Sequence, residues 1–260
     1  MNIIVCIKSV SMTAGSGDAL RPYDALELNP FDRPVIETAL SLKEAGGGTV
    51  TALSMGPEST VSILLETLAM GVDRGVLACD PAFAGSDTLA TSTVLAAAAR
   101  KLRPFDLLLF GTRTADSDTG QVGPQTAVLL DLPFVGLVHA IEAADTGLCV
   151  ERVSDHFSER LESPYPAALT IHPGSVQPRE IGLAGIGTAF EEKERITFFN
   201  RRDLGLAPEQ VGDAGSPTRV LSISRRPHRK TCELLKGSSP LEQADELMRR
   251  LREGGLIGQA

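Results

Sequence analysis

The sequence predicts an α/β fold with a doubly wound, mostly parallel sheet, followed by a C-terminal arm with a helix. Short apolar runs alternate with longer helical segments up to residue 130. Such alternation is typical of parallel strands joined by right-handed crossovers. The strand runs are rich in β-branched and leucine residues, which indicates a sheet covered by helices on both faces.

Four strands and four helices are expected in this part of the chain. The expected strands are residues 2–8, 49–56, 74–79 and 105–110. The expected helices are residues 29–48, 57–71, 86–102 and 119–130. Local signals define the helix ends: Asn29 can cap the first helix and Ser86 the third, and Gly71 can end the second.

The pattern changes after residue 134. Residues 134–173 indicate short antiparallel strands around turns. Residues 174–220 are irregular, and residues 239–255 have the pattern of an amphipathic helix. We therefore expect an α/β domain of residues 1–173 and an extended arm with a C-terminal helix, residues 174–260. An arm of this length usually packs against another protein surface, and a partner subunit is the obvious candidate. The alternative is a disordered tail.

Composition limits the classes of function. The 260 residues carry a formal net charge of −8, which argues against a nucleic-acid partner. The four cysteines form no CxxC pair and the four histidines are scattered, so we assign no metal site and expect a reducing, cytoplasmic environment. No apolar stretch approaches the length of a membrane span, so we expect a protein that is not membrane-embedded.

A polar loop, "GTRTADSDTGQVG" (111–123), follows the strand of residues 105–110. In parallel sheets ligands bind beyond the carboxyl ends of the strands, and the N-terminus of a helix attracts phosphate. Asp118 or Thr119 can cap the following helix, while Gly120 and Gly123 allow close approach of a phosphate. The alternative is an ordinary capped turn, and the acidic residues would repel phosphate. Neither a P-loop nor a GxGxxG motif is present, and no catalytic side chain is assigned.

Several stretches together resemble the β subunit of electron-transfer flavoproteins. They occur in family order and include "NPFD" (29–32), "AMGVDR" (69–74) and "DSDTGQVG" (116–123). The resemblance implies a flavodoxin-like or HUP-like domain that binds an adenine nucleotide. It also implies a heterodimer with an α subunit that holds FAD. Such a complex passes electrons between an acyl-CoA dehydrogenase and another redox partner, so the flavin rather than this chain's side chains carries the chemistry.

The family has two branches with different ligands in the β subunit. The common branch holds a structural AMP, and the electron-bifurcating branch holds the ADP half of a second FAD, reduced by NADH. Thr119, Val122 and Pro124, together with "GSPTRV" (215–220), favour the bifurcating branch. Whether the chain is part of an enzyme depends on this choice. A third possibility is a stand-alone adenine-nucleotide sensor without a redox role.

The resemblance also implies the ligand-binding residues. It places adenine and ribose at Cys6, Ile7 and Lys8, with Asn29 reaching the nucleotide. It places Ser54, Met55 and Gly56 on the far side and the phosphates at Thr119, Gly120, Gln121, Val122 and Gly123. Gly111 and the segment Thr112 to Thr114, together with residues 9–28, are nearest to a flavin ring. Asp118 is expected to turn toward backbone N–H groups, and Asp116 toward solvent or a ribose hydroxyl.

Overall fold

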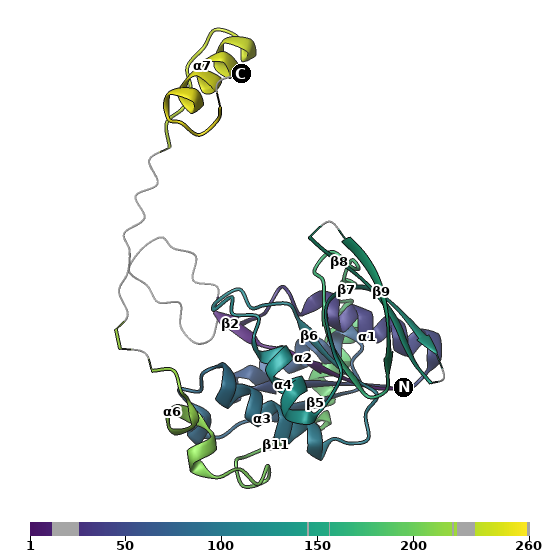
Figure 1. The fold of residues 1–260 in the computed structure, drawn as a ribbon. Helices are drawn as coiled ribbons and strands as arrows, with labels where there is room; N and C mark the ends of the chain where they lie inside the picture. Colours follow the sequence, from purple (N-terminus) through teal and green to yellow (C-terminus); the bar gives the residue numbers. More distant parts are fainter. Residues whose placement is uncertain (12–25, 145, 156, 220, 223–231, 259–260) are drawn as a thin grey trace. The chain divides into compact units, whose positions relative to one another are not determined.

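The computed structural model of the chain describes residues 1–11, 26–144, 146–155, 157–219, 221–222 and 232–258. These residues form two compact units, Met1–Arg219 and Val220–Ala260, which are treated separately below (Figure 1). No helix in the described part of the chain is long and apolar enough to cross a membrane.

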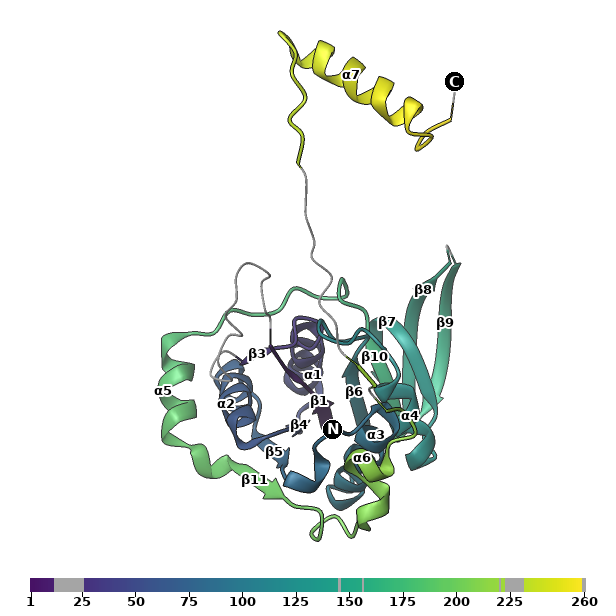
Figure 2. The same cartoon turned by 90° about the vertical axis from the view of Figure 1, so that its left-hand side faces the viewer.

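The first unit is built on a nine-stranded sheet with the order β11-β5-β4-β1-β6-β10-β7-β8-β9 (Figures 1 and 2). The strands from β11 to β7 are parallel to their neighbours, and β8 and β9 continue the sheet in antiparallel pairing. Their bounds are β1 Asn2–Cys6, β4 Thr49–Met55, β5 Arg74–Ala78, β6 Leu107–Gly111, β7 Phe134–Ala144, β8 Gly147–Ser154, β9 Phe157–Pro164, β10 Ala167–Ile171 and β11 Ile196–Phe199. The prediction of a doubly wound, mostly parallel sheet is confirmed.

Helices cover both faces of this sheet. They are α1 Arg33–Gly46, α2 Val61–Met70, α3 Thr88–Lys101, α4 Val122–Leu130, α5 Leu183–Glu191 and α6 Gly212–Gly215. Short 3-10 turns lie at Glu58–Thr60, Pro81–Phe83, Lys193–Arg195 and Pro208–Gln210. A small antiparallel pair, β2 Ser9–Ser11 and β3 Leu26–Leu28, follows β1. The α-helix of the second unit is α7, Pro240–Glu253.

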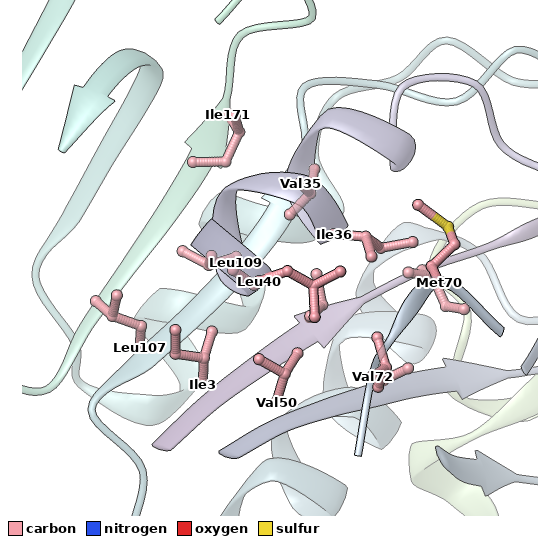
Figure 3. Close-up of a cluster of buried hydrophobic side chains, with 14 of the residues drawn as sticks. Ile3, Val35, Ile36, Leu40, Val50, Met70, Val72, Leu107, Leu109 and Ile171 are labelled. Carbon is pink, nitrogen blue, oxygen red and sulfur yellow. The ribbon is translucent and has the colours of Figure 1, made fainter. Parts of the chain in front are cut away.

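Side-chain alternation along the strands creates two cores. Ile3 and Val5 of β1 pack with α1 and α2 on one face, whereas Ile4 and Cys6 pack with α3 and α4 on the other. Figure 3 shows the first core, where α1 places Leu40 and its neighbours over the strands. Because β1 is apolar at every position from 3 to 6, it fits only where both faces are covered.

All four predicted helix starts were too early, by two to four residues. α2 begins at Val61, after the 3-10 turn Glu58–Thr60, rather than at 57. The first helix begins at Arg33 rather than 29, because the side chain of Asn29 bonds elsewhere and caps nothing. α3 is capped by Asp87, whose carboxylate accepts the Leu89 and Ala90 N–H groups; Ser86 does not cap it. α4 begins at Val122 without a side-chain cap. The end of α2 at a left-handed glycine, residue 71, is confirmed.

The segment after residue 173 contributes to the first unit. β11 pairs in parallel with β5 at the edge of the sheet, with Ile196 and Phe199 buried. Ala189 of α5 is buried in the core that contains α2. The compact unit thus runs on to Arg219, because this part of the expected arm covers a sheet edge that would otherwise expose unpaired backbone groups.

An ion-pair cluster holds the connection between β10 and α5 against α1. Arg179 donates from its backbone N–H and its Nε to one carboxylate oxygen of Glu37 (3.0 and 2.8 Å) and from a terminal nitrogen to the other (2.8 Å). A further terminal nitrogen bonds Glu44 at 2.8 Å. The hydrogen bonds from Arg179 hold the pKa of the buried Glu37 below its ordinary value despite burial.

We predict that Arg179→Met lowers the free energy of unfolding by about 2 kcal/mol, because it strips a buried carboxylate of its cation. Glu37 has a lowered pKa, so its contribution is complete at neutral pH and is lost as the pH falls through that pKa. Urea titrations at pH 7 and pH 4 measure both effects, and the difference between wild type and variant is expected to shrink at pH 4.

Glu44→Gln is the matched control. It removes only the exposed partner of the same arginine, so a much smaller change is expected. Equal losses in the two variants, or a loss in Arg179→Met that does not depend on pH, would contradict the role assigned to the buried pair.

Candidate functional site

The strand order reverses beside β1. From β1 the chain moves to β4 and then β5 on one side, and it returns to β6 on the other side. The connection after β1 leads to α1 on one face of the sheet, and the connection after β6 leads to α4 on the opposite face (Figure 2). The carboxyl ends of β1 and β6 therefore form the topological switch point, where open α/β sheets bind ligands.

The structure brings the predicted ligand-binding segments together at this edge. Cys6, the last residue of β1, pairs in register with Leu53 of β4 and Phe110 of β6. The predicted residues lie at or just after these three strand ends. They are Cys6, Ile7 and Lys8 for β1, Ser54, Met55 and Gly56 for β4, and Gly111 and Thr112 for β6. That these segments lie close together was predicted from the alternation of strands and helices alone, because the carboxyl ends of parallel strands lie at the same side of a sheet.

Ser54 has a structural task at this edge. Its side chain is fully buried, and its hydroxyl donates to the Ile7 carbonyl at 3.0 Å. The Ile7 N–H donates in turn to the Leu53 carbonyl at 2.9 Å. Ser54 thus extends the pairing of β1 and β4 beyond the last strand residues, which fixes the backbone that leads to Lys8.

Two buried polar residues of the NPFD segment join the separate parts of the site. Asp32 accepts the Lys8 N–H at 2.8 Å and the Asn29 amide at 2.9 Å. Asn29 also donates to the Arg113 carbonyl at 3.0 Å and accepts the Ala115 N–H at 3.2 Å. The end of β1, the start of α1 and the loop after β6 are therefore held by one hydrogen-bonded group, called the Asn29–Asp32 hub below.

The residue at position 111 must be small for the hub to form. A Cβ at Gly111 would lie 2.3 Å from Asp32 Oδ1, well inside contact distance. The sequence prediction placed Gly111 in the site because of the approach of a ligand. The structure gives a different reason, which is the approach of the Asp32 carboxylate from behind the loop.

Burial raises the pKa of Asp32 from 3.8 to about 7, and the charge of Asp116 adds to the increase. The hydrogen bonds from Lys8 N–H and Asn29 and the Lys8 charge oppose it. Because the folded pKa lies above the unfolded one, the ionised carboxylate lowers the free energy of unfolding above pH 7. This cost disappears as the pH falls toward 4.

The two acidic residues of the loop are paired with cations. Asp116 lies 2.6 Å from Lys8 Nζ, and Asp118 lies 3.3 Å from a terminal nitrogen of Arg113. Burial alone would raise the pKa of Asp116, but the Lys8 hydrogen bond and nearby hydroxyls outweigh it and lower the pKa. Asp116 is exposed, as expected, and also pairs with Lys8. The expectation that Asp118 binds backbone N–H groups was wrong, because its carboxylate turns to Arg113.

The cation of Arg113 has a second contact, over the ring of Phe31 at 4.7 Å. Thr114 shares a 2.8 Å hydrogen bond with the hydroxyl of Ser117, and Asp118 N–H donates to the Thr114 carbonyl at 3.0 Å. The loop from 111 to 118 is therefore folded on itself. It places Arg113 at the switch point, where Lys8 follows β1, and its two acidic residues pair with both cations.

The start of α4 keeps free backbone donors. Gln121 takes the cap position without a side-chain cap hydrogen bond, and its amide oxygen accepts the Thr88 hydroxyl of α3 at 3.0 Å. Within the described residues, no hydrogen bond uses the N–H groups of residues 119–122, which are exposed or half-buried. Neither Asp118 nor Thr119 caps the helix, so these donors remain available to an anion.

Gly123 lies deeper than the predicted phosphate contact requires. A Cβ there would lie 3.1 Å from Thr170 Cγ2 and 3.3 Å from Phe110 Cγ. The glycine lets the first turn of α4 pack closely on β6 and β10. This packing keeps the helix N-terminus at the edge of the sheet, and it is a reason for glycine that does not involve a ligand.

Sequence reasoning missed two parts of the site. Asp32 belongs to the NPFD motif, which gave a signal, but its burial could not be predicted from the motif. The sequence singled out the stretch "GSPTRV" but did not predict where it lies in the fold. In the structure, Ser216 accepts the Asp87 N–H at 2.8 Å, and Thr218 N–H donates to Asp87 at 3.0 Å. Ser216 and Thr218 thus lie at the N-terminus of α3, beside the helix start that contacts Gln121.

The histidines do not form a metal site in the described part of the chain, where no group of three or more metal-ligating side chains occurs. His139 of β7 and His172, just after β10, stack with ring centroids 3.9 Å apart. Burial lowers the pKa of His172, and the charge of His139 adds to this effect. His156, His228 and most of the segment 9–28, namely 12–25, lie outside the described residues.

Comparison with known proteins gives consistent matches. A family model described as the electron transfer flavoprotein domain matches residues 21–194. The caffeyl-CoA reductase-Etf complex subunit CarD of Acetobacterium woodii is 37% identical over 99% of this chain and 100% of that protein. An electron transfer flavoprotein subunit beta of Thermoanaerobacterium thermosaccharolyticum is 35% identical, and an acryloyl-CoA reductase electron transfer subunit gamma of Anaerotignum propionicum is 34% identical, each over 99% of this chain and all of the relative.

We predict that Asp32→Asn loosens the loop after β6. An amide at position 32 turns a donor toward either Lys8 N–H or Asn29, so one of the two hydrogen bonds is lost. Hydrogen–deuterium exchange of peptides that cover residues 6–10 and 111–117 is expected to rise about tenfold, which corresponds to the loss of about one hydrogen bond.

Asp73→Asn is the matched control, because Asp73 also accepts a backbone N–H, that of Val50 at 2.7 Å, but at the opposite edge of the sheet. It should leave exchange of residues 111–117 unchanged. In the wild type, protection of this loop, corrected for intrinsic rates, should increase as the pH falls from 7 toward 4, because the closed hub binds the Asp32 proton more tightly than an opened loop does. The role of the hub would be refuted if the loop were as protected in Asp32→Asn as in the wild type and if its protection in the wild type did not change with pH.

Proposed function

The chain belongs to the electron transfer flavoprotein family as a β-type subunit, and we propose that it forms a heterodimer with an FAD-bearing α subunit. In this proposal the complex passes electrons between an acyl-CoA dehydrogenase and a second redox partner in the cytoplasm. The names of two relatives support a partner that acts on CoA thioesters. One relative is a subunit of a caffeyl-CoA reductase complex, and the other is an electron transfer subunit of an acryloyl-CoA reductase.

The observation that carries the proposal is the set of free donors at the switch point. The N–H groups of residues 119–122, between β6 and α4, have no hydrogen-bond acceptor among the described residues. Lys8 and Arg113 lie at the same edge with side chains 41% and 53% exposed. Backbone donors at a helix start together with two cations suit the phosphates of an adenine nucleotide.

The loop acids need not exclude such a ligand. Asp116 and Asp118 neutralise Lys8 and Arg113 in the protein alone, so no unpaired charge stands at the switch point. We infer that a phosphate takes the place of one or both carboxylates on the two cations. The carboxylates can then turn to solvent, because both acidic residues are exposed.

The remaining predicted contacts follow the strand ends. Cys6, Ile7 and Lys8 would hold adenine and ribose, Met55 and Gly56 would lie opposite, and Thr112 and Thr114 would border a flavin ring. Asn29 acts from behind the loop, since its amide is fully buried and bonded on both sides. When bound, the flavin supplies the electron-transfer chemistry, while this chain's residues bind and orient it.

The choice between AMP and FAD rests on the loop and on the tail stretch. Thr119, Val122 and Pro124 favour FAD in this pocket, and so does the tail stretch, whose Ser216 and Thr218 lie at the start of α3, near the Thr88 that contacts Gln121. We therefore propose the bifurcating arrangement, with NADH as the electron donor. The alternative is a structural AMP with a complex that only ferries electrons, and a stand-alone adenine-nucleotide sensor is the alternative outside redox function.

The second unit supplies a contact surface for the α subunit. α7 has one apolar stripe, in which Leu241, Leu247 and Met248 are 73%, 45% and 42% exposed. Its other side carries ion pairs of Glu246 with Arg249 and Arg250. An amphipathic helix with its apolar stripe in water needs a partner surface, and we propose that the α subunit provides it.

We predict that the αβ complex releases two FAD and no AMP when it is denatured. Chromatography of the released nucleotides counts them. NADH is expected to reduce one of the two flavins in an absorbance titration of the intact complex.

One FAD and one AMP would reject the bifurcating assignment and keep the family function. Two FAD that NADH does not reduce would reject NADH as the donor. Adenine nucleotide without any flavin, in a chain that binds no α subunit, would favour the sensor.

We predict that trypsin cleaves the chain alone within residues 220–260 and that the α subunit protects this part. Leu247→Glu places a charge in the apolar stripe and should weaken the heterodimer at least about tenfold, since burial of one leucine contributes about 1.5–3 kcal/mol. Gln243→Glu adds the same charge outside the stripe and should have little effect. Equal weakening by both variants, or an unprotected helix in the complex, would contradict the proposed contact.

A further inference from the structure

A pocket lies at the amino edge of the sheet, opposite to the switch point. Its volume is about 460 Å³, within the range of small-molecule sites. It is formed by the first residues of β1, β4 and β5 and by the end of α3 with the connection to β6. The lining residues are Asn2, Thr49, Asp73, Arg74, Lys101, Leu102, Arg103 and Pro104.

Three cationic side chains line this pocket. Arg74 comes from β5, Lys101 from the end of α3, and Arg103 from the connection that follows. In the described part of the chain none of them forms an ion pair. Arg74 donates from Nε to the Thr51 hydroxyl at 2.7 Å, which leaves its terminal nitrogens free. Lys101 bonds the Asp203 carbonyl at 3.1 Å, and Arg103 lies over the Phe105 ring at 6.0 Å.

The acidic residues at this edge are already engaged. Asp73, the acidic lining residue, lies 2.6 Å from Lys43 Nζ and accepts the Val50 N–H at 2.7 Å. Asp106 accepts the Asn2 N–H at 2.6 Å. No carboxylate of the described residues is therefore ion-paired with the three cations of the pocket, although the chain as a whole carries a net charge of −8.

Stabilisation of the α3 dipole does not account for the cluster. Basic residues in the last turn of a helix are favourable, which explains Lys101 and its neighbour Arg100. Arg74 belongs to a strand and Arg103 lies beyond the helix end, so neither is placed for that purpose. Like charges gathered around one hollow repel each other, and an anion bound between them removes the repulsion.

We propose that this pocket binds a small polyphosphate, either free or as the terminal phosphates of a nucleotide. The guanidinium groups of Arg74 and Arg103 suit bidentate contacts to phosphate oxygens, and Lys101 adds a point charge. An acidic protein surface is less suitable, since Leu102 and Pro104 are the only apolar side chains of the lining and offer little to a protein interface core. The site is separate from the switch point, which lies at the other end of the same strands.

The test uses calorimetric titration of the full chain with inorganic tripolyphosphate at low ionic strength. Saturating AMP is present to occupy any nucleotide site at the switch point. Binding is expected, weaker for inorganic phosphate and weaker again as salt is added. The double variant Arg74→Gln with Arg103→Gln should lower the affinity about tenfold, as two partly exposed ion pairs do.

The matched control is Arg152→Gln with Arg160→Gln, which removes the same charge away from the pocket. Arg152 lies on β8 and Arg160 on β9, at the far end of the strand order, and both arginines pair with glutamates. Unchanged affinity in this control supports the site. Equal losses in both double variants would show a response to net charge alone, and no binding by the wild type would overturn the proposal.

ATP and tripolyphosphate, compared under the same conditions, distinguish the two sources of phosphate. Tighter binding of ATP that survives saturating AMP indicates a nucleotide, and equal binding indicates a free polyphosphate; either outcome supports the site. The titration is repeated in the presence of the α subunit. Loss of all binding there would show that a protein surface covers the pocket, and it would overturn the proposal of a small ligand.

Discussion

The Asn29–Asp32 hub connects three parts of the chain that are far apart in sequence. Asp32 fixes the backbone after β1 through Lys8 N–H, and Asn29 fixes the loop after β6 through the Arg113 carbonyl and the Ala115 N–H. These are the two connections that diverge at the switch point. Without the hub, the loop that leads to the start of α4 would have no buried polar anchor on the side of α1, so the orientation of the free N–H donors depends on it.

The hub has an electrostatic cost that the surroundings limit. A buried carboxylate is unfavourable in its charged form, which is why its pKa rises to about 7. The two donors that it accepts and the nearby Lys8 charge offset part of this cost. Lys8 is itself shared with Asp116 at 2.6 Å. A ligand that takes Lys8 away from Asp116 therefore changes the field at Asp32 as well, which couples the loop, the cation and the hub.

The fold was largely predictable because its signals are local. Runs such as residues 2–8 and 105–110 are apolar on both faces, and the four strands expected before residue 111 were placed to within two residues at either end. The helix starts were less predictable, because a cap depends on where a side chain turns. Asn29 and Asp118 have good capping chemistry, but tertiary partners take both of them. β11 was also missed as a strand of the main sheet, since four residues within an irregular segment give no pattern.

The site was predictable in outline and not in its contacts. The switch-point geometry and the loop sequence indicate where a ligand binds, and the family resemblance adds its class. The pairing of Lys8 with Asp116 joins residues 108 positions apart, so no local pattern could predict it. The same holds for Asp87 with Thr218, 131 positions apart. Long-range partners of this kind decide whether an acidic loop repels phosphate, and only the folded arrangement shows that these acids are neutralised.

The segment after β11 connects the amino ends of the sheet strands with their carboxyl ends. Near the C-terminal end of α3, Lys101 bonds the Asp203 carbonyl; at its N-terminal end, Asp87 bonds Ser216 and Thr218. Between these points Leu206 and Val211 are buried against α3. The segment therefore runs along the helix from the cationic pocket to the neighbourhood of Gln121. One helix and one attached segment thus set the geometry at both edges, so a change in packing along α3 affects the amino-edge pocket and the switch point together.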